Sequence, residues 1–162
     1  MTGMPERVRA PWFIVILLAM LVAQPFSLQA AGFQRVQVPD PDGAAIEVAI
    51  WYPSHAAPAP VAMGPVTQVV APGAAIDGDR LPLILISHGT GGSALGHHDT
   101  ASALADAGYV VAALMHRGDN YADQSRAVPI MDRPKQVRRV LGFSFFAGWA
   151  RGGRDSDLAV AG

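Results

Sequence analysis

The sequence contains no cysteine, and this absence excludes several kinds of chemistry. Without thiols the chain forms no disulfides, binds no metal through thiolates and has no cysteine nucleophile. Charged residues are also scarce, at 15% of the chain, and the net charge is −1. Because so small a net charge creates no strong attractive field, we expect neither nucleic acid nor an acidic membrane surface as a partner. No resident metal or organic cofactor is predicted.

The N-terminal segment has the composition of a secretory signal peptide. Arg7 and Arg9 form a short basic region, residues 11–23 are almost wholly apolar, and residues 30–32 are small. This order of basic, apolar and small residues is typical of cleaved signal peptides. A retained membrane anchor is the alternative, but a spanning helix needs about 20 apolar residues and this run is shorter. We therefore expect residues 1–31 to be removed and the mature protein to be secreted or periplasmic, with no stable membrane span.

After this segment the sequence predicts a hairpin followed by a long loop. Residues 33–38 and 46–52 alternate apolar and polar side chains, as half-buried strands do, and a turn-forming cluster at 39–43 separates them. Residues 53–80 are rich in proline, alanine and glycine. We expect an ordered loop there, with one short edge strand at 66–70; a disordered linker is the alternative.

The middle of the chain predicts a strand–helix–strand unit. Residues 83–86 and 109–114 are continuous apolar runs, which is the pattern of parallel strands buried on both faces. Between them we expect a helix over 99–107, capped by Asp99 or Thr100, with a right-handed crossover. A second helix is expected to begin at Asp132, with its apolar face formed by Val137, Val140, Leu141 and Phe145.

The glycine-rich segment 87–92, Ser-His-Gly-Thr-Gly-Gly, has three interpretations. As an oxyanion hole, its backbone N–H groups would stabilise the negative charge that develops during acyl transfer. As a dinucleotide site, Gly89, Gly91 and Ala94 would fit the pattern G-x-G-x-x-A, although the helix is expected to begin several residues later than that pattern requires. As a metal site, the ligand set would lack the helical i, i+4 spacing of a zincin. That set would be His88, His97, His98, Asp99 and His116.

Residues 81–92 and 99–120 together resemble the predicted dienelactone hydrolases, which are related to plasma-type platelet-activating-factor acetylhydrolases. Residues 39–43 and 49–54 also resemble that family, so the similarity extends from about residue 32 to residue 141. The resemblance implies an α/β-hydrolase fold and a Ser-Asp-His triad that cleaves small-molecule esters. It assigns the oxyanion-hole N–H to Thr90, in a loop with His88, Gly89, Gly91 and Gly92. His116, Arg117, Gly118 and Asp119 match the family's next loop, without an assigned role.

The sequence departs from the family at the nucleophile. The family's serine lies in G-x-S-x-G on a strand-to-helix turn, and this sequence has no such pentapeptide. The nearest segment, Gly142-Phe-Ser144, lacks the final glycine and continues a helical pattern. The fold's triad runs serine, acid, histidine, yet His116 is the last histidine. No nucleophile is therefore assigned.

The sequence thus predicts an incomplete α/β-hydrolase fold over residues 32–162. It consists of the hairpin and the strand–helix–strand unit of a mainly parallel sheet, without nucleophile elbow or downstream triad. The predicted function is that of a truncated or degenerate secreted serine ester hydrolase, inactive as it stands. One alternative is a non-catalytic binding or interaction protein on the same half-fold. Another is a Rossmann-like dinucleotide-binding module that uses Gly89, Gly91 and Ala94.

The signal-peptide hypothesis makes a direct prediction for exported protein. Its N-terminus should lie close to Gly32, because the small residues before this position suit signal-peptide cleavage. N-terminal sequencing of protein recovered outside the cytoplasm checks this. An exported chain that still begins at Met1 would contradict it.

Overall fold

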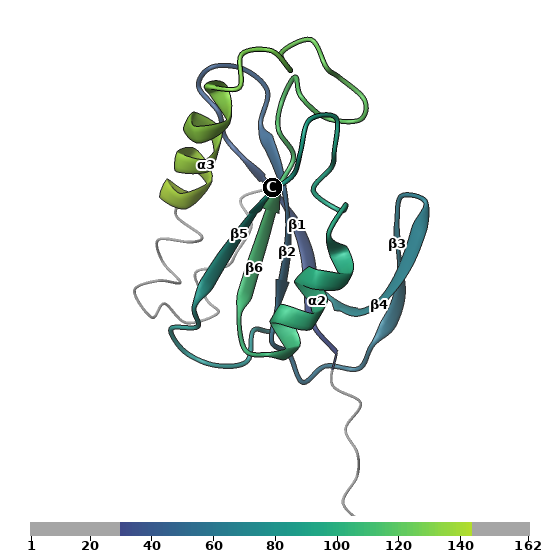
Figure 1. The fold of residues 1–162 in the computed structure, drawn as a ribbon. Helices are drawn as coiled ribbons and strands as arrows, with labels where there is room; N and C mark the ends of the chain where they lie inside the picture. The colour runs from purple at the N-terminus through teal and green to yellow at the C-terminus, as the bar shows by residue number, and fades with distance from the viewer. Residues whose placement is uncertain (1–29, 144–162) are drawn as a thin grey trace, which may run out of the picture.

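The computed structural model describes residues 30–143 of the chain. This part has two helices and one six-stranded sheet, with the strands in the order β3-β4-β1-β2-β6-β5 (Figure 1). The bounds are β1 Gly32–Val38, β2 Ile46–Tyr52, β3 Ala59–Met63, β4 Val66–Pro72, β5 Leu83–Ser87, α2 His98–Asp106, β6 Val110–Leu114 and α3 Asp132–Gly142. Within this part no helix is long and apolar enough to cross a membrane.

The predicted hairpin is present as β1 and β2. The two strands pair antiparallel along their whole length, from Gly32 opposite Tyr52 to Val38 opposite Ile46. A Cβ atom on Gly32 would lie only 2.1 Å from the ring of Tyr52, so glycine is the residue that fits here. The Tyr52 hydroxyl donates a hydrogen bond of 2.8 Å to the carbonyl of Ala74, which ties the hairpin to the following loop.

The predicted strand–helix–strand unit is also confirmed. β5 and β6 lie side by side and parallel, with Ser87 opposite Leu114, and α2 connects them. The start of α2 differs slightly from the prediction: the helix begins at His98, so neither Asp99 nor Thr100 is its N-cap. Just beyond its end Gly108 has a φ of 95°, a conformation that glycine adopts without strain.

Burial of the two parallel strands differs from the expectation. β6 is completely buried, as predicted, whereas the side chains of β5 are half-buried and Ser87 is exposed. The reason is the position of β5 at one end of the sheet, where no further strand covers its outer edge within residues 30–143. In these residues the sheet is also mixed rather than mainly parallel, because β2 pairs antiparallel with both β1 and β6.

The segment after β2 is more regular than predicted. The edge strand expected at 66–70 is present as β4, but it pairs along its length with a second strand, β3, that the sequence analysis missed. Pro58 and Pro60 concealed β3, since proline is poorly tolerated in the interior of a sheet. Here the strand lies at the opposite end of the sheet from β5, where a missing N–H is tolerated.

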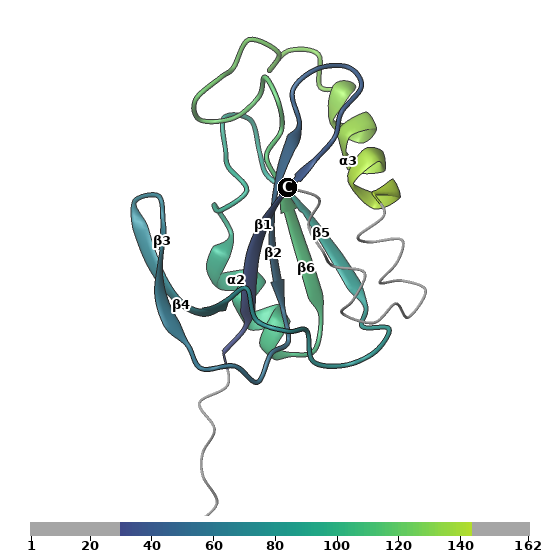
Figure 2. The ribbon, with the colours of Figure 1, turned by 180° about the vertical axis from the view of Figure 1, so that it is seen from behind.

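Each face of the sheet carries one helix, as the two opposite views show (Figures 1 and 2). α2 packs Ala101 and Ala105 against a cluster that includes Phe33 and Trp51, whose rings are 5.0 Å apart. α3 packs against the other cluster through Val140. The sheet core is therefore apolar on both faces, and polar groups concentrate at the ends of the strands.

A buried carboxylate connects the β1–β2 turn to more distant segments. Asp40 has a fully buried side chain that accepts the N–H of Asp42 and pairs with Arg139 of α3 through the same oxygen, Oδ1. Its Oδ2 lies 3.0 Å from Nη1 of Arg117, close enough for an ion pair but outside hydrogen-bond alignment. One buried carboxylate thus contacts the turn, α3 and the loop after β6.

Replacing Asp40 with alanine should lower the free energy of unfolding by about 2 kcal/mol, because two half-buried arginine side chains lose their buried carboxylate partner. Asp42→Ala is the matched control, since Asp42 belongs to the same turn and contacts Arg139 but is largely exposed. Its effect should be clearly smaller. Urea denaturation of the three proteins measures both changes, and equal losses in the two variants would contradict the role of Asp40.

Candidate active site

The candidate site lies where β5 and β6 end. Because the two strands are parallel, the loop that follows Ser87 and the loop that follows Leu114 emerge at the same edge of the sheet. The first turn of α3 reaches the same place, and all three segments gather at the top of the molecule in Figure 1. The glycine-rich segment 87–92 predicted as an oxyanion loop is therefore at the edge where α/β sheets bind ligands.

His88 is buried and fixes the shape of this loop. Its Nε2 accepts the backbone N–H of His116 at 3.1 Å, so the ring proton must be on Nδ1. Nδ1 then donates to the carbonyl oxygen of Gly89, 2.7 Å away. The same oxygen accepts the N–H of Gly92, which closes a tight turn around Thr90. The imidazole thus joins the two loops and orients the glycine backbone.

An ion pair clamps the loop from the other side. Oδ1 of Asp119 accepts the N–H of Gly91 at 3.0 Å, and its Oδ2 receives two hydrogen bonds from the Arg133 guanidinium, at 2.9 and 2.6 Å. Arg133 also donates to the carbonyl oxygen of His88 at 2.6 Å. Gly91 has a φ of 70°, which favours glycine at this position. Asp119, to which the sequence assigned no role, is therefore a positioning residue for the loop.

The environment of Asp119 favours its charged form. Burial raises the pKa of this carboxyl. The hydrogen bonds from the Gly91 N–H and the Arg133 guanidinium lower it by a larger amount, so the pKa lies below the ordinary value of 3.8. The carboxylate and guanidinium are both largely withdrawn from water, with side-chain exposures of 3% and 15%. The clamp is therefore a charge-assisted pair at neutral pH, with two guanidinium donors on one carboxylate oxygen.

With its neighbours fixed in this way, Thr90 lies at the exposed tip of the loop. Its backbone N–H makes no hydrogen bond within residues 30–143, whereas those of Gly91 and Gly92 are both bonded. A donor that is held in place but unbonded is what an oxyanion hole requires.

The structure also brings together a serine and a histidine that the sequence analysis did not pair. Oγ of Ser87 lies 2.7 Å from Nε2 of His116, and Nδ1 of His116 lies 3.0 Å from Oε1 of Gln136 in α3. Because Oε1 also accepts the backbone N–H of Arg117, it is an acceptor, so His116 carries its proton on Nδ1. Its Nε2 therefore accepts the Ser87 hydroxyl proton. Only the parallel register of β5 and β6 could have revealed this pair.

Burial lowers the pKa of His116, which is fully buried, below its ordinary value of 6.5. The hydrogen bond to Gln136 acts in the opposite direction but is outweighed, and His88 and Arg133 add to the lowering. His116 is therefore neutral at pH 7 and able to accept a proton.

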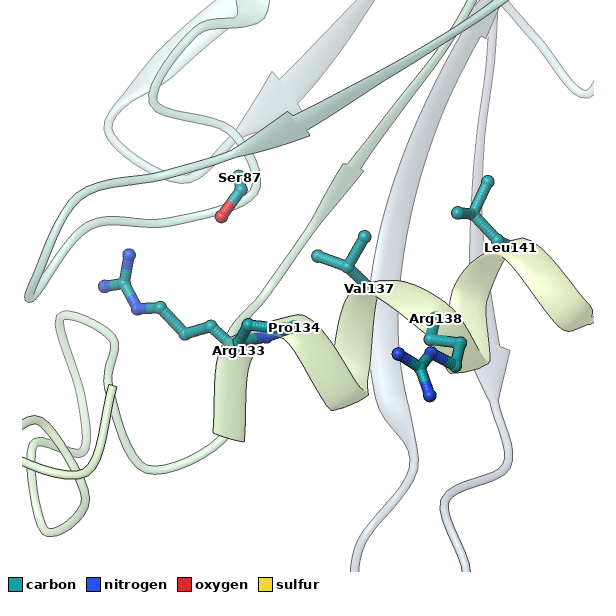
Figure 3. A pocket seen from close by; sticks show the side chains of 6 residues that line it. All are labelled: Ser87, Arg133, Pro134, Val137, Arg138 and Leu141. Atoms are coloured by element: carbon teal, nitrogen blue, oxygen red, sulfur yellow. The ribbon is translucent and has the colours of Figure 1, made fainter. Parts of the chain in front are cut away.

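A cavity of about 370 Å³ opens beside Ser87 (Figure 3). Its other lining residues come from α3 and are Arg133, Pro134, Val137, Arg138 and Leu141. The cavity thus combines a hydroxyl and guanidinium groups with an apolar wall.

The other interpretations of the glycine loop receive less support from the geometry. α2 begins at His98, outside segment 87–92, so no helix opens on the glycines as a dinucleotide fingerprint requires. Among residues 30–143 no group of three or more histidine, aspartate or glutamate side chains could hold a metal ion. His88 and His116 are instead ring neighbours, with centroids 4.9 Å apart. Ser144 and Phe145 lie outside the described residues.

Comparison with known proteins shows a similar fold and a family model that matches part of the chain. A ferulic acid esterase from Streptomyces cinnamoneus superimposes with a TM-score of 0.55 at 23% sequence identity, over 74% of this chain and 48% of its own. The chain thus spans about half the length of that esterase. The described residues form part of an α/β-hydrolase fold, as predicted. Residues 59–136 match the family described as platelet-activating factor acetylhydrolase, isoform II, which confirms the resemblance inferred from the sequence. No curated protein sequence matches the chain.

The Asp119 clamp predicts a change in loop stability. Asp119→Asn should speed amide hydrogen exchange at Gly91 roughly tenfold, because a neutral side chain gives a weaker acceptor and loses the ion pair with Arg133. Exchange in β6, which the clamp does not hold, serves as the internal control. Unchanged exchange at Gly91 in the folded variant would show that the loop is fixed without Asp119.

The same carboxyl predicts an acid dependence. Because its pKa is lowered in the folded state, Asp119 stabilises the protein above the ordinary value of 3.8, and this contribution is lost as the pH falls through the lowered pKa. The free energy of unfolding of Asp119→Asn should therefore fall less than that of the original chain below about pH 3.8. Parallel slopes in the two proteins would contradict this.

Proposed function

We propose that this chain provides the oxyanion-binding part of a serine ester hydrolase that acts on small-molecule esters. The α/β-hydrolase fold and the match to the acetylhydrolase family support the reaction class. The proposal rests above all on one observation: the Thr90 N–H lies in a clamped loop and has no hydrogen-bond partner in the described residues. The predicted signal peptide supports export of the enzyme.

The other half of the oxyanion hole and the nucleophile would come from a strand placed against β5. The outer edge of β5 is unpaired in residues 30–143, and a parallel strand there would end beside Ser87. A G-x-S-x-G turn at the end of such a strand would bring its serine to the edge of the sheet that carries Thr90. The following residue would supply the second N–H donor.

In the proposed reaction this serine attacks the ester carbonyl, and a histidine from the same additional segment accepts the serine proton. The negative charge that develops on the carbonyl oxygen is stabilised by the Thr90 N–H and by the N–H that follows the nucleophile. His88, Asp119 and Arg133 keep the Thr90 donor in place before the substrate binds. Since the printed sequence has no G-x-S-x-G, we expect no turnover by this route without such a segment.

The test is a chimera in which residues 1–141 are followed by the nucleophile- and triad-bearing half of a close relative. Thr90→Pro removes the backbone donor and should lower kcat by roughly 10²–10³, the effect of losing one oxyanion hydrogen bond. Thr90→Ala keeps the N–H and should have a mild effect, which makes it the matched control. Short acyl esters serve as substrates. A folded Thr90→Pro chimera with full kcat would exclude Thr90 as the donor.

A further inference from the structure

We propose that Ser87 is a nucleophile in its own right: activated aryl esters bound in the cavity beside α3 acylate its Oγ. His116 acts as the general base, and Gln136 is a positioning residue that holds the imidazole. This site adjoins the Thr90 oxyanion loop but uses a different nucleophile and base, and it requires no G-x-S-x-G segment.

The geometry is that of a serine activated by a neighbouring base. Nε2 of His116 is 2.7 Å from Oγ of Ser87, within the distance at which a base takes a hydroxyl proton. The serine is exposed and lines the cavity, while the imidazole behind it is fully buried. Gln136 accepts from Nδ1 and so fixes the tautomer that leaves Nε2 ready to accept. Base and orienting group are thus in place around an accessible hydroxyl.

The groups around His116 determine its state of protonation. The ring faces His88 from the loop after β5, Asp119 from its own loop, and Arg133 and Gln136 from α3. Burial, His88 and Arg133 lower the pKa of His116 and outweigh Gln136 and Asp119, which raise it, so the pKa lies below 6.5 and the base is neutral at pH 7. Below that pKa the imidazole is protonated and can no longer accept the Ser87 proton.

The cavity favours an aryl ester over a charged or strongly polar one. Its wall is formed by Pro134, Val137 and Leu141, against which an aromatic ring can pack (Figure 3). Arg133 lines the same cavity, and its guanidinium has five N–H donors, of which Asp119 and His88 use three. The remaining donors are available to the ester carbonyl oxygen as it gains negative charge.

The step balances without any additional reactant. Oγ of Ser87 bonds to the acyl carbon while its proton moves to Nε2 of His116, and the bond between the acyl carbon and the phenol oxygen breaks. The phenolate leaves with the bonding electrons, and His116 returns its proton to solvent. Hydrolysis of the acyl-serine must expel the much more basic serine alkoxide, and Gln136 carries no charge to stabilise the imidazolium that this requires. We therefore expect one acyl group per chain, with little turnover.

The experiment uses the full chain and p-nitrophenyl acetate at about pH 7.5, near which the base is neutral. Intact-mass and peptide mass spectrometry should show one acetyl group, on Ser87. Ser87→Ala should abolish this label. Ser125→Ala is the matched control, since Ser125 is an exposed serine whose N–H bonds to Asp123, away from the histidines, and it should label at the original rate.

Two further variants separate a base from a structural histidine. His116→Gln should slow labelling by about 10²-fold, the usual contribution of a general base. Gln136→Glu places a carboxylate against Nδ1, which should raise both the labelling rate and the pH at which it is half-maximal. Since His116→Gln replaces a buried residue, the pH profile of the original chain is measured as well. It should fall on the acid side with a midpoint below 6.5.

Labelling of Ser87 that follows this pH profile and rises in Gln136→Glu would support the proposal. Acetylation confined to Lys135, the terminal amine or another serine would overturn it, as would Ser87 labelling with no dependence on pH. The proposed ester hydrolase function is tested in a different protein, the chimera, through turnover that depends on Thr90. Failure of either idea is therefore distinguishable from failure of the other.

Discussion

The parallel pairing of β5 with β6 is the constraint on which the site depends. Its register places Ser87 beside Leu114, so that the two following loops begin side by side at one edge of the sheet. From there His88 reaches the backbone of His116, Asp119 reaches the backbone of Gly91, and Ser87 reaches the imidazole of His116. A shift of one residue would turn every side chain of β5 to the opposite face and would break all three contacts.

A closed polar network surrounds the end of this apolar core. Buried polar groups destabilise a protein unless they are hydrogen-bonded, and here His88, His116, Asp119 and Gln136 all have partners. These partners belong to two loops and one helix, so the loop after β5 is held by two other elements, the loop after β6 and α3. The Thr90 N–H is not part of this network. The Ser87 hydroxyl bonds to His116, but Ser87 is exposed to solvent. Preorganisation of this kind is what makes a backbone donor effective at a developing charge.

Most of the framework followed from hydrophobic patterning. Alternation predicted β1 and β2, and continuous apolar runs predicted β5 and β6. A strand buried on one face alternates apolar and polar residues, whereas a strand buried on both faces is apolar throughout. The errors have equally physical reasons. β3 contains proline at an edge where its missing N–H does no harm, and β5 is less buried than its composition implies because it lies at the end of the described sheet. Local sequence does not record the position of a strand in the order of a sheet.

The sequence by itself determined the chemistry available at the loop. It identified the glycine segment and the α/β-hydrolase resemblance, and through that resemblance it predicted Thr90 as the donor, because these depend on short motifs within one continuous stretch. Only the tertiary structure decided which side chains support that segment. The pair of Asp119 with Arg133, and the chain of contacts from Ser87 through His116 to Gln136, join residues from separate elements. Their contacts arise from strand register and from the packing of α3 against the sheet, which no linear spacing encodes.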